Sequence, residues 1–171
     1  LSELQELLGL PEAPLRIECY DMAHLQGTDY VGSMVVLEDG LPNKREYRRF
    51  KVGVPGNDDY AAMEEVLTRR LKAYLDERDQ PLDDELADLQ SVQVKQRPKR
   101  FAYPPQLLLV DGGKGQLAVA ERVVRRLGLH DEIPIASLAK RFEEVYLPGS
   151  SVPVEVPRGS DALFMLQRIR D

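Results

Sequence analysis

Two largely apolar segments that each end on an aspartate constrain the fold of this chain more than any other feature. Leu15–Asp21 (LRIECYD) and Leu107–Asp111 (LLLVD) read as short β-strands, and Val31–Leu37 is a third strand-like segment without any charge. Such strands normally lie inside a sheet, where a terminal carboxylate is costly unless a partner or a cation compensates it. The pattern therefore predicts a sheet that brings two carboxylates to one edge, where together they can form a metal site.

The order of the remaining periodic segments predicts the fold class. Strands are expected over 15–21, 31–37, 45–52, 107–110, 133–138, 145–147 and 152–156, and helices over 1–10, from 57 to about 75, over 116–127 and from 161 onward. Three consecutive strands followed by alternating helices and strands imply an α/β fold with a mixed sheet flanked by helices. We expect residues 1–14 to be a linker or short helix in front of one domain over 15–171.

The charge of the chain is concentrated in one segment. The net charge is −6, and residues 76–88 alone carry −6, so the remainder is neutral. Basic residues are bunched in two places: Lys44, Arg45, Arg48, Arg49 and Lys51, then Lys95, Arg97, Lys99 and Arg100. The acidic balance therefore does not exclude a nucleic acid as partner, although solvated surfaces account for these clusters equally well. We interpret 76–105, which is first acidic, then basic and rich in proline, as an excursion from the domain.

Cysteine and hydropathy indicate where the protein works. The single cysteine, Cys19, excludes an internal disulfide and fits a reducing, cytoplasmic location, where a small buried filler is the expected role. The sequence has no segment long enough to span a bilayer and no signal-peptide pattern, so a membrane is not expected among the partners.

The glycine-rich segment Asp111–Gly115 (DGGKG) invites comparison with nucleotide-binding loops. A P-loop requires glycine where Leu108 stands and serine or threonine where Gly115 stands, and no G-x-G-x-x-G is present. What remains is a carboxylate at a strand end, a turn without side chains, and Lys114 at a helix start. This suits a metal carboxylate beside a phosphodiester backbone. The local alternative is an aspartate that caps a glycine turn, and Asp21 alone could equally bond turn amides.

The two histidines support no other catalytic class. His24 lies close enough in sequence to approach Asp21, although packing in the turn is the more ordinary role, and His130 is expected on the surface. Two histidines this far apart do not suggest zinc, and no Ser-His-Asp set can be assembled.

Eight short motifs, in order, resemble one known family. They are Glu18–Asp21, Gln26–Thr28, Ser33–Val36, Glu46–Phe50, Asn57–Met63, Leu67–Arg70, Val110–Gln116 and Leu166–Asp171. They are similar to the C-terminal nuclease domain of the UvrC family, the incision subunits of bacterial nucleotide excision repair. The resemblance covers about residues 15–171. It implies an RNase H-like fold and a divalent-metal endonuclease that cuts a damaged DNA strand on the 5′ side of a lesion.

The resemblance also implies roles for individual residues. Asp21 and Asp111 match the catalytic aspartates, which hold Mg²⁺ or Mn²⁺, and Asp59 matches a further carboxylate implicated in incision. We expect the strands that carry Asp21 and Asp111 to be neighbours, with carboxylates within about 4–6 Å of each other. Arg48, Arg49 and Lys114 are candidates to position DNA phosphates without reading sequence. The implied partners are damaged double-stranded DNA and the UvrB–DNA complex.

Departures from the family leave other functions open. The family continues from the motif at 166–171 into a Glu-Ala-His run whose histidine is catalytic, and this sequence stops before it. We therefore expect a truncated domain that folds but cuts DNA poorly. Phe164 stands where many relatives have histidine. The alternatives are a non-catalytic RNase H-like binding or docking module and a small-molecule phosphohydrolase.

Overall fold

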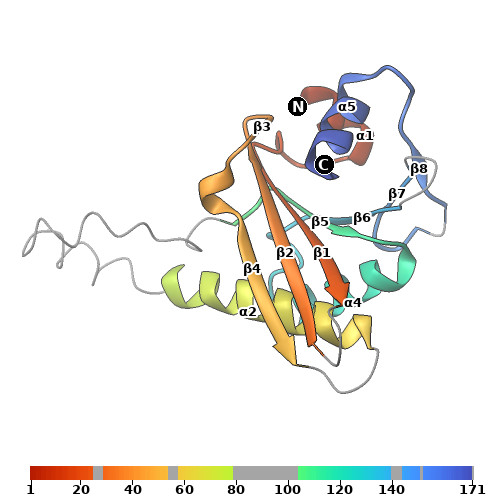
Figure 1. Ribbon diagram of the computed structural model, residues 1–171. Coiled ribbons are helices and arrows are strands. Elements are labelled where there is room, and N and C mark those ends of the chain that lie inside the picture. The colour runs from red at the N-terminus through yellow and green to blue at the C-terminus, as the bar shows by residue number, and fades with distance from the viewer. Residues whose placement is uncertain (25–28, 54–57, 79–103, 140–143, 151, 171) are drawn as a thin grey trace, which may run out of the picture.

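The protein is built around one eight-stranded sheet that separates two layers of helices (Figure 1). The computed structural model describes residues 1–24, 29–53, 58–78, 104–139, 144–150 and 152–170. The strands are β1 (Arg16–His24), β2 (Asp29–Glu38), β3 (Leu41–Pro42), β4 (Arg48–Gly53), β5 (Leu107–Asp111), β6 (Ile135–Leu138), β7 (Glu144–Tyr146) and β8 (Val154–Glu155). The helices are α1 (Ser2–Leu8), the 3₁₀ turn η1 (Lys44–Glu46), α2 (Asp59–Arg78), α4 (Lys114–Arg126) and α5 (Asp161–Arg170).

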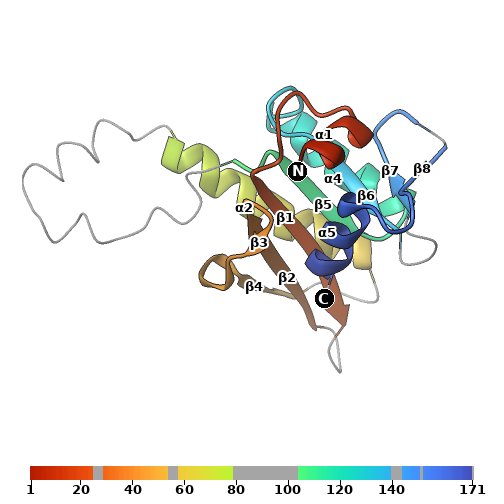
Figure 2. The same cartoon turned by 90° about the horizontal axis from the view of Figure 1, so that it is seen from above.

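The sheet is mixed, as the order of elements predicts. Its strands lie in the order β3-β2-β1-β5-β6-β7-β8, with β4 paired to β2. β1, β5 and β6 are parallel neighbours, whereas β2, β4, β7 and β8 pair antiparallel. Helices α2 and α4 cover one face and α1 and α5 the other, which Figure 2 shows from above. The α/β fold class with a mixed sheet between helices is therefore confirmed.

Each face of the sheet has its own hydrophobic core. The alternation of side chains in β5 divides its residues between them: Leu108 and Val110 pack under α2 and α4, and Leu107 and Leu109 pack under α1 and α5. A strand covered on both sides must be apolar throughout, which is why β5 carries no charge before Asp111. None of the helices in these described stretches is long and apolar enough to cross a membrane.

Several boundaries differ from the sequence prediction for local reasons. β1 does not end at Asp21 but continues to His24, because it pairs with β2 through the register His24↔Tyr30. Lys44–Glu46 forms η1, so the third long strand begins only at Arg48. Residues 79–103, most of the expected excursion, lie outside the described residues, and α2 occupies its first residues up to Arg78.

Gly32 is a point where β2 approaches helix α2 too closely for a side chain. A Cβ atom at this position would lie 2.7 Å from Val66 Cγ2 and 3.1 Å from Met22 Sδ, in a packed core. We expect Gly32→Ala to lower the free energy of unfolding by about 1–3 kcal/mol, because overpacking forces backbone or rotamer shifts. Chemical denaturation measures this. Gly53→Ala is the control, since a Cβ there meets nothing within 4 Å, and an equal loss in both variants would contradict the packing argument.

Candidate active site

Asp21 and Asp111 lie side by side on adjacent parallel strands. The register pairs Tyr20 of β1 with Val110 of β5, so the next pair along is Asp21 and Asp111. Ile17 and Cys19 precede Asp21 on the same face, and both pack in the core beneath α1 and α5, as Leu107 and Leu109 do before Asp111. Neighbouring strands are about 4.8 Å apart, so the two side chains leave the same face within reach of a single ion. The expected adjacency of the two strands is confirmed.

The surroundings of the pair combine access with a rigid turn. Asp21 is exposed and Asp111 is half-buried. The turn after Asp111 requires glycine, because Gly112 has φ 152° and a Cβ there would lie 2.5 Å from Cδ of Gln116. The Gln116 side chain in turn accepts the N–H of Gly113 at 3.0 Å. This turn fixes where β5 ends and where α4 begins, and so holds Asp111 in place.

The donor chemistry of the pair fits a hard divalent cation. Carboxylate oxygens suit Mg²⁺ and Mn²⁺, and Mg²⁺ is commonly held by one or two carboxylates together with water and substrate phosphate oxygens. Among the residues that the structure describes, no group of three or more histidine, cysteine, aspartate or glutamate side chains could hold a metal by itself. If the pair held such a cation, water and substrate phosphate oxygens would supply its other ligands.

Asp59 lies at the start of α2, on the opposite face of the sheet from the pair. The cap of this helix is Asp58, whose Oδ1 accepts the N–H of Ala61 at 3.0 Å, and Asp59 is the acidic residue of the first turn. Burial raises the pKa of Tyr30 in the core beneath α2, and hydrogen bonding and the charge of Asp59 raise it further. Asp58, Asp59, Tyr60 and Gln116 line a small hollow beside the β5–α4 turn.

The two acidic residues at the start of α2 should respond differently to substitution. Asp58→Ala should lower the free energy of unfolding by about 1 kcal/mol, because it leaves a helix N–H without its cap. Asp59→Asn should cost less than about 1 kcal/mol through the helix dipole and leave the rate of DNA cutting unchanged. Denaturation curves and nicking rates of both variants check this. A large loss of cutting by Asp59→Asn at unchanged stability would place Asp59 in the active site instead.

The three basic residues proposed to contact DNA have different surroundings. Arg48 points toward the α2 side, where its guanidinium donates to the carbonyls of Arg45 and Tyr47 at 2.8 and 2.7 Å and lies 3.6 Å from Glu46. Lys114 lies over the ring of Tyr146, 5.5 Å from its centroid. Arg49 is exposed and faces the same side as Asp21. Of the three, Arg49 is the cation on the carboxylate face of the sheet.

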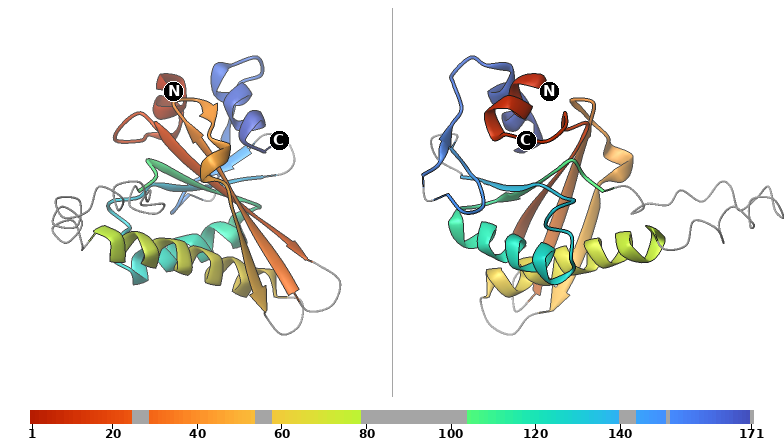
Figure 3. Two further views of the ribbon diagram at one scale, coloured as in Figure 1. Left: turned by 60° about the vertical axis from the view of Figure 1, so that its left-hand side comes forward. Right: turned by 180° about the vertical axis from the view of Figure 1, so that it is seen from behind.

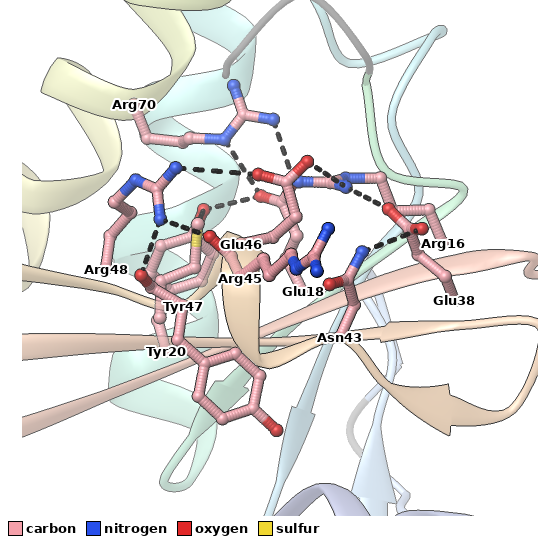
Figure 4. Close-up of polar contacts among 11 residues, drawn as sticks. Arg16, Glu18, Tyr20, Glu38, Asn43, Arg45, Glu46, Tyr47, Arg48 and Arg70 are labelled. Carbon is pink, nitrogen blue, oxygen red and sulfur yellow. Dashed lines mark hydrogen bonds and ion pairs between the residues drawn. The ribbon is translucent and has the colours of Figure 1, made fainter. Parts of the chain in front are cut away.

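Figure 4 shows a buried ionic cluster that sequence reasoning missed. Glu18, three residues before Asp21, points to the other face and is completely buried with Arg70 of α2. Arg70 donates to both carboxylate oxygens of Glu18 at 3.0 and 2.7 Å, Arg16 donates at 2.9 Å, and the Tyr20 hydroxyl at 2.6 Å. Arg16 also pairs with Glu38 at 2.6 Å. The only sign of this cluster in the sequence is that charged residues interrupt strand and helix patterns that are otherwise apolar.

Electrostatics keep this cluster ionised. Burial alone would raise the pKa of Glu18, but the charges of Arg70 and Arg16 and the hydrogen bonds from Arg70 and Tyr20 outweigh it and lower the pKa below its ordinary value of 4.5. Burial raises the pKa of Tyr20 well above its ordinary range, and the charge of Glu18 adds to the effect. The cluster ties β1, which carries Asp21, to helix α2.

Comparison with known proteins gives one consistent family. Residues 5–171 match the model of the UvrC RNase H endonuclease domain. Proteins named UvrABC system protein C from Streptomyces avermitilis and Acidothermus cellulolyticus are 53% and 51% identical over 175 residues, covering 100% of this chain and 26% and 27% of the relatives. The chain thus spans about a quarter of the length of these relatives.

The chain also has a distant likeness to a solved structure. The crystal structure of Ciona intestinalis endonuclease V, in complex with a 24-mer DNA that contains inosine, is 15% identical with a TM-score of 0.37. The match covers 81% of this chain and 55% of that one.

Proposed function

This chain belongs to the family of UvrC RNase H endonuclease domains, and we propose that it is a divalent-metal-dependent DNA endonuclease domain of nucleotide excision repair. Within that proposal, the domain makes the incision on the 5′ side of a lesion. The observation that carries the proposal is the pair of carboxylates, Asp21 and Asp111, that adjacent parallel strands direct to one face of the sheet.

The residues of the chain divide the work of hydrolysis among them. Asp21 and Asp111 hold the cation, since their oxygens lie on neighbouring strands and Asp21 is open to solvent. The Mg²⁺ or Mn²⁺ that Asp21 and Asp111 would hold would supply Lewis acidity, to activate water and to offset negative charge on the leaving 3′ oxygen. Arg49 binds an oxygen of a neighbouring phosphate and fixes the backbone without reading sequence. Lys114 begins the helix that follows the glycine turn and lies over Tyr146, so it adds positive charge near the end of β5 without lying on the carboxylate face.

The proposed partners follow from the family. The substrate is damaged double-stranded DNA, presented as a UvrB–DNA complex. The relatives named UvrABC system protein C are about four times as long as this chain, so the proposal assigns only the cutting step to it. Recognition of the lesion belongs to other parts of the system.

The test is to map the cut. The full-length protein is incubated with its repair partners, a duplex that carries one defined lesion and a label at the 5′ end, and either Mg²⁺, Mn²⁺ or EDTA. We expect one cut on the 5′ side of the lesion that requires the metal and disappears in Asp21→Asn. Binding to the complex without this cut would indicate the docking module, and hydrolysis of a small phosphate ester but not of DNA would indicate a phosphohydrolase.

A further inference from the structure

Part of the sheet face that carries Asp21 is not covered by any of the described helices. The register places two rows of side chains on it: Asp21, Ser33 and Arg49 in one, and Ala23, Val31 and Lys51 in the next. All six are exposed or half-buried. In the views of Figure 3, α1 and α5 lie over the opposite end of the sheet, and the ends of β1, β2 and β4 extend beyond them. We name these six residues the open sheet surface.

The sheet is open on only one side of the carboxylate pair. Asp111 is in register with Leu138 of β6, which is in register with Val145 of β7. Leu138 and Val145 are 1% and 0% exposed and pack in the core beneath α1 and α5. A polymer that reaches Asp21 and Asp111 along this face can therefore continue over β2 and β4, but not over β6 and β7.

Exposed positive charge lies on the same open side of the carboxylate pair, on strand β4. Arg49 lies two strands from Asp21, about 10 Å between their Cα atoms, and Lys51 lies about 7 Å further along β4. Within the described parts of the chain, neither side chain forms an ion pair. Other arginines are paired: Arg48 lies near Glu46, and Arg122 and Arg126 contact Glu64. Two exposed cations beside two carboxylates that hold a cation are complementary to a phosphodiester chain.

We propose that the open sheet surface binds the backbone of the cleaved DNA strand, which runs from the carboxylate pair across β2 to the edge strand β4. Arg49 and Lys51 bind two phosphates on one side of the scissile bond, and the Ser33 hydroxyl donates to a phosphate oxygen between them and Asp21. These contacts position the strand and carry no sequence information. The inference rests on the proposed nuclease function, because it takes the carboxylate pair as the point of cleavage.

Salt dependence of DNA binding tests the inference separately from cutting. Binding of a fluorescent duplex is measured by anisotropy in EDTA, where no cutting takes place, for wild type, for the double variant Arg49→Ala/Lys51→Ala, and for the control Lys72→Ala/Arg125→Ala. The control removes two exposed charges from α2 and α4 on the other face. We expect the slope of log Kobs against log salt to fall in magnitude by about 1.8 in the first double variant, since each phosphate contact contributes about 0.9, and to stay unchanged in the control.

Cross-linking locates the strand directly. Ser33→Cys should exchange with DNA that carries a mixed disulfide on its backbone, forming a disulfide to the DNA and releasing the small thiol. Lys72→Cys should not, and buried Cys19 gives little background. Equal slopes in both double variants, or cross-linking at Lys72 instead of Ser33, would overturn the inference. Self-association of Arg49→Ala/Lys51→Ala with unchanged DNA binding would also overturn the inference. It would show that these charges prevent the edge strand β4 from pairing with another chain. If the slope falls in Arg49→Ala/Lys51→Ala but neither the wild type nor any variant cuts DNA, the nuclease proposal fails while the assignment of the DNA-binding surface is still supported.

Discussion

Asp21→Asn should reduce metal-dependent DNA cutting by at least about a hundredfold while leaving the fold intact. A bound metal contributes several kcal/mol to the transition state, each 1.36 kcal/mol is a factor of ten in rate, and an amide is a weaker ligand than a carboxylate. Asp21 is exposed, so its stability change should stay within about 0.5 kcal/mol. Asp111→Asn should give the same loss of cutting. Single-turnover nicking and denaturation curves measure the two quantities.

Metal binding can be followed without activity. Mn²⁺ should raise the unfolding midpoint of wild type, because a ligand that binds only the folded state stabilises it, and should not raise that of either variant. Asp131→Asn is the matched control, since Asp131 is an exposed loop aspartate far along the chain from both strands. A wild-type response to Mn²⁺ in Asp21→Asn, together with normal cutting, would remove Asp21 from the metal site.

Arg70→Ala should be the most destabilising single substitution in the ionic cluster. It leaves the carboxylate of Glu18, which is completely buried, with only part of its compensation, and breaking a buried ion pair costs about 3–5 kcal/mol. For a domain of this size the unfolding midpoint should fall by roughly 6–20 °C. Arg126→Ala is the control, because its pair with Glu64 at 2.9 Å is accessible to solvent, with the two side chains 48% and 28% exposed, and should contribute less than about 1 kcal/mol. Similar losses in both variants would show that burial does not decide the strength of the Glu18–Arg70 pair.

The same cluster predicts how stability depends on pH. The pKa of Glu18 is lower in the folded protein than its ordinary value of 4.5. Its contribution to stability is therefore fully present above about pH 4.5 and is lost as the pH falls through the lower, folded value. Glu18→Gln should be less stable than wild type at neutral pH and should lose less stability below pH 4.5. Parallel pH–stability curves for the two proteins would contradict this.

Sequence periodicity predicts most of the elements because these strands and helices have simple surroundings. β5 is covered on both faces and so reads as an unbroken apolar run, and Gly128 ends α4 in a left-handed conformation, as its place after the apolar stripe suggests. The extension of β1 from Asp21 to His24 could not be read in this way. It depends on pairing with β2 across a turn, which is a non-local contact.

In the candidate site, too, features that depend on local sequence could be predicted and features that depend on non-local contacts could not. Its two aspartates are predicted because each follows an apolar strand in a place where a charge needs explanation, and the structure shows that the two strands are neighbours. The separate roles of the basic residues could not be predicted from the sequence, because Arg48 and Arg49 are adjacent in the chain and their side chains point to opposite faces of the sheet. Arg48 joins Glu46 on one side and Arg49 is exposed on the other. The partnership of Glu18 with Arg70 joins residues 52 positions apart and becomes visible only in the fold.

Alternation in β1 makes the stretch Glu18–Asp21 intolerant of any shift in register. Glu18 and Tyr20 face the ionic cluster, and Cys19 and Asp21 face the opposite side. A slip of one residue would turn Asp21 toward α2, the helix that holds Arg70, and turn Glu18 into the apolar core beneath α1. Glu18 would then be a buried charge without its arginine partners, and Asp21 would leave the exposed face. Deletions or insertions of one residue should therefore be tolerated between α1 and Arg16, but not within β1. Within β1, the cost of burying a charge on the wrong face fixes the register and keeps the carboxylate of Asp21 on the exposed face.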